Sequence, residues 1–143
     1  MTDLTQILHV EDDPNIADVV RISLTILGGF EVHQFASGTD AVASAPTLAA
    51  DLLLLDMMMP GLDGLATLEK LRQMPQFAAT PAVLFTAKTI DLPVGEDAAV
   101  RGIIATIRKP FGAAELPGQI RELWDAYYLA NQSQDLPSER SVA

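Results

Sequence analysis

The chain contains no cysteine, which excludes disulfide bonds and thiolate zinc sites. It also lacks an N-terminal basic segment followed by an apolar stretch, and its unbroken apolar runs are only a few residues long, so neither export nor membrane spanning is supported. Basic residues are scarce, since 9 Lys and Arg stand against 19 Asp and Glu for a net charge of -10. We therefore expect a cytoplasmic protein that binds a cation or another protein and makes no direct contact with nucleic acid or membrane.

Short apolar segments alternate with amphipathic segments along the 143 residues, a length that suits one domain. Strands are expected at 7–10, 30–35, 52–55, 81–85 and 103–107. Capping residues and prolines indicate helix starts at Asp13-Pro14, Ser37, Asp63 and near Pro117. This alternation predicts an α/β fold, a doubly wound (βα)5 flavodoxin-like parallel sheet with strand order 2-1-3-4-5.

Two segments fit the alternation of strands and helices less well. Pro93 and Gly95 limit the helix within 88–101 to about two turns, and we expect this segment to be mobile. From 131 onward the chain is polar and has no apolar periodicity. The sequence therefore predicts one domain at 1–130 and a disordered C-terminal tail at 131–143.

Acidic side chains follow two of the expected strands. Glu11 and Asp12 come directly after the first strand, and Asp56 comes directly after the third. In the predicted order these two strands are neighbours, and the carboxyl ends of parallel strands share one crevice. We therefore expect the three carboxylates to meet there, with Thr86 and Lys109 closing the crevice from the far side.

The same residues resemble those of a known family, the receiver domains of two-component response regulators. The resemblance covers nearly all of positions 6 to 129 and depends on four motifs in order. They are Glu11-Asp12, Asp56 with Met59-Pro60-Gly61-Leu62-Asp63-Gly64, Thr86-Ala87, and Lys109-Pro110-Phe111. Each motif alone is a weak signal, but all four at the spacing of successive βα repeats form a strong one.

The resemblance implies a role for each residue of the crevice. It makes Asp56 the phosphoacceptor, and it assigns Mg²⁺ to Asp12, to Asp56, to Glu11 in support and to the backbone carbonyl of Met58. Thr86 and Lys109 would contact the phosphoryl group, and the Lys109-Pro110 bond would be cis. Physical chemistry agrees, because crowded carboxylates need a compensating cation and because charge on a transferred phosphoryl group must be neutralised.

Several neighbouring residues have simpler interpretations. Asp13 before Pro14 is predicted to be a helix N-cap and not a ligand, and Asp63 has the same status. His9 and His33 alternate with apolar residues, so we expect buried or edge histidines and not phosphohistidine donors. The run of methionines at 57–59 is expected to pack at the mouth of the crevice and not to bind metal through its thioethers.

Two departures from the family pattern carry specific hypotheses. An aromatic switch residue often stands three places before the lysine, but this place is Thr106. We therefore expect switching to depend mainly on Thr86 and on reordering of 88–101. Met58 and Lys88 stand two residues after Asp56 and Thr86, where they would flank the path of the hydrolytic water. The apolar bulk of Met58 should hinder this water, so we predict slow self-dephosphorylation.

The function predicted from these residues is that of a single-domain response regulator, phosphorylated by a histidine kinase or histidine phosphotransfer protein. It would act on a protein target, with no catalysis beyond its own phosphorylation and slow dephosphorylation. A relay shuttle or phosphate sink remains an open alternative. Trp124, Tyr127 and Tyr128 either form part of a partner or homodimer surface or cover the sheet edge.

Two rivals from other classes fit less well. A phosphatase of the haloacid dehalogenase type needs a second carboxylate two residues after its nucleophile, where this chain has Met58. A flavodoxin-like nucleotide binder needs a phosphate loop after the first strand, where the acidic residues at 11–13 would repel phosphate.

Overall fold

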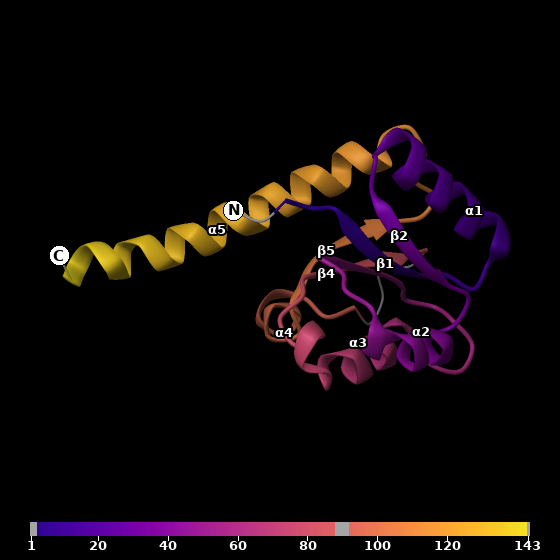
Figure 1. Cartoon of the computed structure of the whole chain (residues 1–143), viewed down its shortest axis with the longest axis horizontal. Helices are drawn as coiled ribbons and strands as arrows, with labels where there is room; N and C mark the ends of the chain where they lie inside the picture. Colours follow the sequence, from indigo (N-terminus) through magenta and orange to yellow (C-terminus); the bar gives the residue numbers. More distant parts are fainter. Residues whose placement is uncertain (1–2, 88–91, 143) are drawn as a thin grey trace.

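The protein is a five-stranded parallel sheet with helices on both faces (Figure 1). The computed structural model describes residues 3–87 and 92–142, and for 132–142 it describes the backbone alone. The strands are β1 (Gln6–Val10), β2 (Glu31–Phe35), β3 (Leu52–Asp56), β4 (Ala82–Thr86) and β5 (Ile103–Arg108). The helices are α1 (Pro14–Ile22), α2 (Gly38–Ser44), α3 (Gly64–Arg72), α4 (Gly95–Val100) and α5 (Leu116–Val142).

The sheet order is β2-β1-β3-β4-β5, and all four strand pairs are parallel, so the predicted fold and strand order are confirmed. β3 lies at the centre, and all five of its residues are buried, as expected for a strand covered on both faces. Two cores result. One packs α1 and α5 against the sheet around Phe85, and the other packs α2 and α3 around Phe77.

Side-chain caps fix three helix starts where the sequence predicts them. The Asp13 carboxylate accepts from the backbone N–H of Asn15, and the Ser37 hydroxyl accepts from that of Asp40. Asp63 caps α3 in the same way, by accepting from the N–H of Ala66. These bonds satisfy donors that a helix start leaves unpaired. Asp13 and Asp63 are therefore confirmed as caps.

The first helix departs from the regular pattern at its end. From Ser23 to Leu27 the backbone forms a π-helix, with the N–H of Gly28 bonded to the carbonyl of Ser23 at 3.0 Å. A π turn inserts an extra residue, so positions after it leave the 3.6-residue register. Leu27, the last residue of the π-helix, is exposed although it is apolar.

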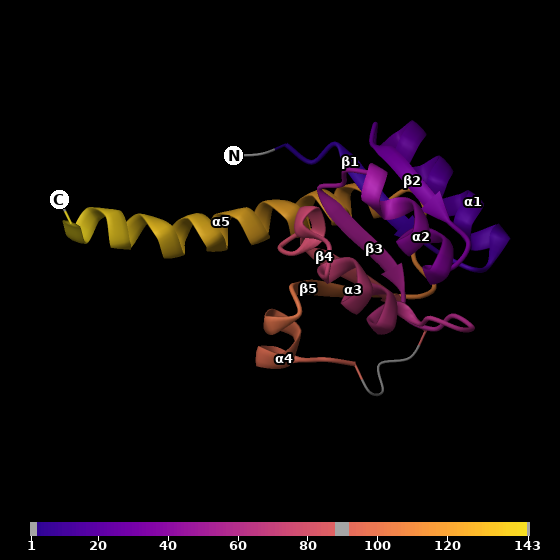
Figure 2. The same cartoon turned by 60° about the horizontal axis from the view of Figure 1, so that its bottom comes forward.

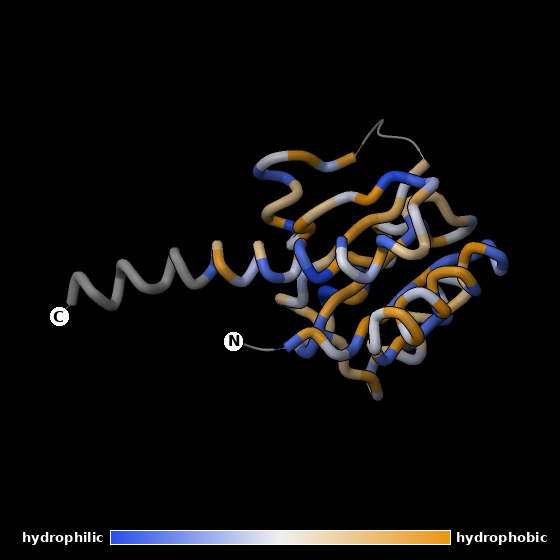
Figure 3. Tube along the Cα trace, turned by 90° about the horizontal axis from the view of Figure 1, so that it is seen from above, coloured by the Kyte–Doolittle hydropathy of each residue, from blue (hydrophilic) through white to orange (hydrophobic). Residues whose placement is uncertain are grey.

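The end of the chain lies in the last helix. The backbone of α5 is helical to Val142, and the predicted limit of the domain at 130, with a tail at 131–143, stays a prediction. The last part of α5 projects away from the sheet in Figure 1, and Figure 3 shows the coloured residues of the helix before it running out from one side of the domain. Apolar periodicity reports packing against a core and not helicity itself, so it gives no signal for a helix that leaves the domain. No helix in the described part of the chain is long and apolar enough to cross a membrane.

α4 is the most weakly attached helix of the described chain. It is six residues long, as Pro93 and Gly95 predict, and none of its residues is buried. Figure 2 shows it standing off the sheet beside β5 and α3. The predicted mobile segment 88–101 also includes 88–91, which lie outside the described residues.

Candidate functional site

Three carboxylates meet at the carboxyl end of the sheet. Val10 of β1 is in register with Leu55 of β3, so the residues that follow each strand emerge side by side. Glu11, Asp12 and Asp56 each offer an oxygen within 4.8 Å of the others. The sequence-predicted acidic cluster is therefore brought together in space, and its spacing suits a cation with oxygen ligands.

The three carboxylates differ in their exposure to water. The side chains of Glu11 and Asp56 are only 1% and 5% exposed, whereas Asp12 is exposed. Two buried like charges at this separation repel each other and lose hydration. The site therefore needs positive charge, and a cation can enter from the solvent side, where Asp12 lies.

Lys109 supplies one positive charge from the other side. Its Nζ donates to Glu11 Oε1 at 2.7 Å and lies 3.2 Å from Asp56 Oδ1. The end of β5 is placed by β4, since the N–H of Lys109 donates to the carbonyl of Thr86 at 2.7 Å. The Lys109–Pro110 bond is cis, as the resemblance implies. The predicted contact of the lysine with the acidic cluster is thus present.

Burial and neighbouring charge alter three ionisable groups here. Burial raises the pKa of Glu11 to about 7, helped by the hydrogen bond with Asp56 and opposed by Lys109. Although burial opposes it, the hydrogen bond with Glu11 and the charge of Asp56 raise the pKa of Lys109. Burial, together with Lys109, lowers the pKa of His9 to about 3. Near neutral pH the site therefore holds Lys109 charged, His9 neutral and Glu11 close to its titration point.

Backbone contacts position Asp56 itself. Its Oδ1 accepts from the N–H of Met58 at 3.3 Å as well as facing Lys109. At Gly64 a Cβ would lie only 2.6 Å from the backbone carbonyl oxygen of Asp56, so the start of α3 can approach the strand this closely only as glycine. The sequence motif contains this glycine, but its role appears only when the distance is known.

Other predicted residues surround the site. Thr86 is buried at the end of β4, while Thr106 is exposed on β5, where it pairs in register with Leu84. Met59 is buried, and Met58, whose N–H bonds Asp56, is 63% exposed, so the methionine run reaches from the core to the surface beside the site. His9 is buried, and Gln34 lies 3.0 Å from its Nδ1, whereas half-buried His33 bonds Gln6, as expected for buried and edge histidines.

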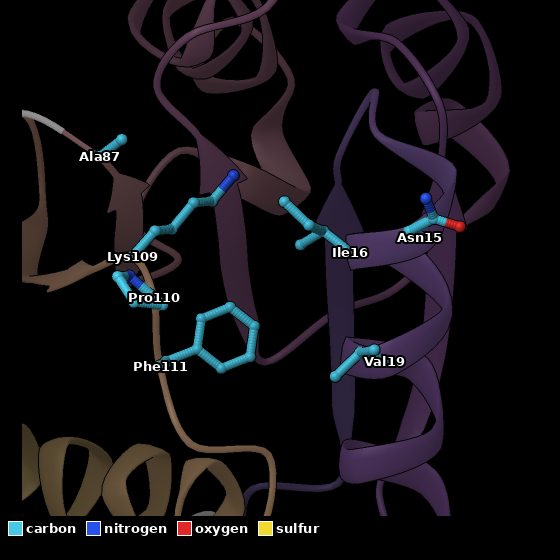
Figure 4. Close-up of a pocket in the computed structure, with 7 residues that line it drawn as sticks. All are labelled: Asn15, Ile16, Val19, Ala87, Lys109, Pro110 and Phe111. Atoms are coloured by element: carbon cyan, nitrogen blue, oxygen red, sulfur yellow. The ribbon is translucent and has the colours of Figure 1, made fainter.

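An apolar pocket of about 480 Å³ adjoins the acidic cluster, and periodicity alone does not reveal it. Ile16 and Val19 of α1 form one wall, and Pro110 and Phe111 form the other (Figure 4). The Lys109 ammonium reaches across its upper edge in this view. Val19 is 45% exposed at this wall. The two walls come from segments far apart in the sequence.

The chain matches the family model of the response regulator receiver domain over residues 7–121. It is 34% identical over 122 residues to the DNA-binding dual master transcriptional regulator RpaA of Synechocystis, covering 84% of this chain and 49% of RpaA. It is 36% identical over 122 residues to the response regulator ArlR of Staphylococcus aureus, covering 84% of this chain and 52% of ArlR. The chain thus spans about half the length of these curated relatives.

Solved structures show the same fold. The chemotaxis protein CheY4 of Vibrio cholerae aligns with a TM-score of 0.73 at 25% identity, over 85% of this chain and 99% of CheY4. The receiver domain of sensor histidine kinase PA1611 from Pseudomonas aeruginosa aligns with a TM-score of 0.68 at 32% identity, over 85% of this chain and 95% of that one. That structure has a magnesium ion coordinated in its active site cleft.

Proposed function

Because this chain belongs to the response regulator receiver domain family, we propose that it accepts a phosphoryl group from a histidine kinase or histidine phosphotransfer protein onto Asp56. The observation that carries the proposal is the contact of Lys109 with two buried carboxylates, beside a third that is open to solvent. Such a site combines a nucleophile, a fixed cation and a place for a divalent metal ion. Those three parts suffice for transfer of a phosphoryl group to a carboxylate.

In the proposed reaction, a carboxylate oxygen of Asp56 attacks the phosphorus of the donor phosphohistidine. The new O–P bond gives an acyl phosphate, and the N–P bond breaks with its electron pair remaining on the donor imidazole. The Met58 N–H and the Lys109 ammonium hold Oδ1 of Asp56 and so fix the orientation of the carboxylate. Enclosure of this carboxylate also limits the access of water to the acyl phosphate.

Lys109 and Thr86 are assigned to the transferred group. Lys109 already faces Asp56, and its ammonium can neutralise charge on the phosphoryl oxygens without moving far. Thr86 ends the neighbouring strand, with its hydroxyl as a donor to the same group. Both residues act through charge and hydrogen bonding, so neither needs to change its covalent state.

The donor set fits Mg²⁺, with Glu11, Asp12, Asp56 and the carbonyl of Met58 as the proposed ligands. Carboxylate and carbonyl oxygens are the ligands that this ion prefers, and the exposed position of Asp12 leaves room for its waters. When bound, the ion supplies positive charge for the carboxylates and for the incoming phosphoryl group.

The proposed output is contact with a protein target in the cytoplasm, without further catalysis by this chain. A relay shuttle or phosphate sink uses the same site and differs only in where the phosphoryl group goes. RpaA is named as a DNA-binding protein, and this chain spans about half of it. That this chain makes no direct contact with nucleic acid remains a prediction, as does a homodimer through Tyr127 and Tyr128.

The test is phosphoryl uptake from acetyl phosphate, followed by intact mass. We expect wild type to gain one phosphoryl group with Mg²⁺ and none with EDTA. Asp56→Asn should gain none, while Asp18→Asn, which alters an exposed carboxylate on α1, should behave as wild type. Uptake by Asp56→Asn equal to that of wild type would exclude the proposed acceptor.

A further inference from the structure

Arg72, the last residue of α3, lies at the end of the sheet opposite the acidic site and contacts no carboxylate in the described part of the chain. Its guanidinium instead bonds four backbone carbonyls. Nε and Nη2 both donate to the carbonyl of Arg101, at 3.1 and 2.9 Å, and Nη2 also donates to that of Gly102 at 3.4 Å. Nη1 donates to the carbonyl of Phe77 at 2.7 Å and to that of Thr80.

These contacts use all five N–H donors of the side chain. A guanidinium that is half-buried and bonded only to carbonyls has lost water without gaining a negative partner. Burial accordingly lowers the pKa of Arg72, with Tyr127 opposing the change. Such an arrangement is stable only where the carbonyls match the fixed, forked geometry of the guanidinium N–H groups. The ammonium group of lysine cannot reproduce this geometry.

The four carbonyls belong to two connections of the chain. Phe77 and Thr80 lie between α3 and β4, and Arg101 and Gly102 lie between α4 and β5. Arg72 therefore ties the C-terminal end of α4 to the start of β4. The carbonyl of Gly102 also accepts from the N–H of Ala82 at 2.9 Å, so the turn that Arg72 binds is itself bonded to the first residue of β4.

The remainder of α4 has few such attachments. None of its residues is buried, Val100 is 85% exposed, and no side chain caps its N-terminus at Val94. Gly102, just beyond the helix, has φ of +73°, and a Cβ there would lie 2.4 Å from Arg72 Nη2. The backbone conformation and the guanidinium contact thus both require glycine at this turn.

We propose that Arg72 is a positioning residue that anchors the C-terminal end of α4, so that a change of state at Asp56 moves α4 about the contact between Arg72 and Gly102. This inference rests on the proposed function, since it assigns the site a means of transmitting its state. α4 follows the strand that ends at Thr86, and its far end is held by Arg72. A helix held at one end and unburied along its length can reorient without breaking the core.

Amide hydrogen exchange tests the anchor in the unphosphorylated protein. The N–H groups of Arg101, Gly102 and Ala82 report on it, because each is bonded in this turn or to it. In Arg72→Gln we expect these amides to exchange about tenfold faster, given the strength of hydrogen bonds from a charged donor. Unchanged exchange at all three would overturn the anchor.

Arg101→Gln is the matched control. In the described part of the chain, the Arg101 guanidinium forms an ion pair with Asp97 alone, and both side chains are exposed. The substitution removes this guanidinium but leaves the backbone carbonyl that Arg72 binds. We expect wild-type exchange at Gly102 and Ala82 in this variant. Acceleration equal to that in Arg72→Gln would show that the loss of any nearby positive charge suffices, which contradicts the proposal.

Two further variants keep the test decisive if Arg72→Gln fails to fold. Arg72→Lys keeps the charge but not the fork, so it should still accelerate the same amides, and full wild-type protection would overturn the proposal. Gly102→Ala disturbs the contact from the other side and should affect the same amides. The double variant Arg72→Lys with Gly102→Ala should accelerate exchange by less than the combined effect of the two single changes, because both disturb the same contact and only the strain of alanine at φ +73° is separate. Fully additive acceleration would mean that the two residues act independently.

The phosphorylated state tests the coupling. With Mg²⁺ and acetyl phosphate, exchange in wild type should change at 92–97 and stay constant at Arg101 and Gly102. In Arg72→Gln, which should take up phosphoryl normally, the change should extend to those two amides. Equal patterns in both proteins would refute the anchor, whereas absence of phosphoryl uptake by mass would refute the proposed function and leave the unphosphorylated comparison valid.

Discussion

Replacing Glu11 by Gln should stabilise the metal-free protein at pH 8, although it removes a residue of the site. Glu11 is 1% exposed and lies beside Asp56, and this environment raises its pKa from 4.5 to about 7. In the unfolded chain the Glu11 carboxyl releases its proton near pH 4.5, whereas in the folded protein it keeps the proton up to about pH 7. The stability that Glu11 contributes is therefore fully present below pH 4.5 and is lost as the pH rises through 7.

The size of this effect follows from the change in proton affinity. Each pKa unit is worth about 1.4 kcal/mol, so ionised Glu11 costs the fold about 3 kcal/mol well above pH 7. Gln keeps an oxygen that can accept from the Lys109 ammonium, which lies 2.7 Å from Glu11 Oε1. The substitution thus removes the buried charge and preserves the hydrogen bond.

The assay is urea unfolding in EDTA from pH 4.5 to pH 8.5 for wild type and Glu11→Gln. The difference between the two curves isolates Glu11, because groups such as His9 titrate in both proteins. We expect the variant to match wild type near pH 4.5 and to exceed it increasingly up to about pH 8. Added Mg²⁺ should stabilise wild type more than the variant at pH 8. A difference that is constant with pH, or a less stable variant at pH 8, would refute this reasoning.

Three other substitutions probe separate parts of the site. Gly64→Ala should reduce phosphoryl uptake at least about tenfold, since its Cβ would lie 2.6 Å from the Asp56 carbonyl oxygen, and Gly118→Ala, with open space around its Cβ, is the control. Met58→Asn should shorten the lifetime of the phosphorylated protein, measured by mass, because Met58 is 63% exposed at the site mouth and its apolar bulk hinders water. Asp13→Ala should lower the free energy of unfolding by about 1 kcal/mol through loss of the cap, measured in urea, without preventing uptake.

Each of these has an outcome that contradicts it. Wild-type uptake in Gly64→Ala would mean that α3 can retreat from the strand without disturbing Asp56. An unchanged lifetime in Met58→Asn would remove Met58 from the path of the hydrolytic water. Loss of Mg²⁺-dependent uptake in Asp13→Ala would indicate that Asp13 is a ligand as well as a cap.

The strand order and the meeting of the acidic residues were predictable because each depends on short-range signals. Residues 52–55 form an unbroken apolar run, and the caps at Asp13 and Asp63 mark where chains turn after strands. Parallel connections then leave few possible orders. Once β1 and β3 are neighbours, Glu11 and Asp56 must lie at one edge, so the site follows from the topology.

Other features depend on contacts that leave no local pattern. Arg72 binds backbone carbonyls. Because every residue has one, the sequence does not indicate which of them Arg72 binds. The apolar pocket needs Val19 and Phe111, which are far apart in the chain. The π-helix at 23–27 is a local departure of the backbone that apolar spacing does not indicate.

The measurement that tests the central claim most directly is the location of the phosphoryl group. Protein treated with acetyl phosphate and Mg²⁺ is reduced with borohydride, which converts a phosphorylated aspartate to homoserine, and then digested and sequenced by mass spectrometry. The account predicts homoserine at position 56, and none in samples prepared with EDTA. Homoserine at Asp12 or another carboxylate, with Asp56 intact, would contradict it.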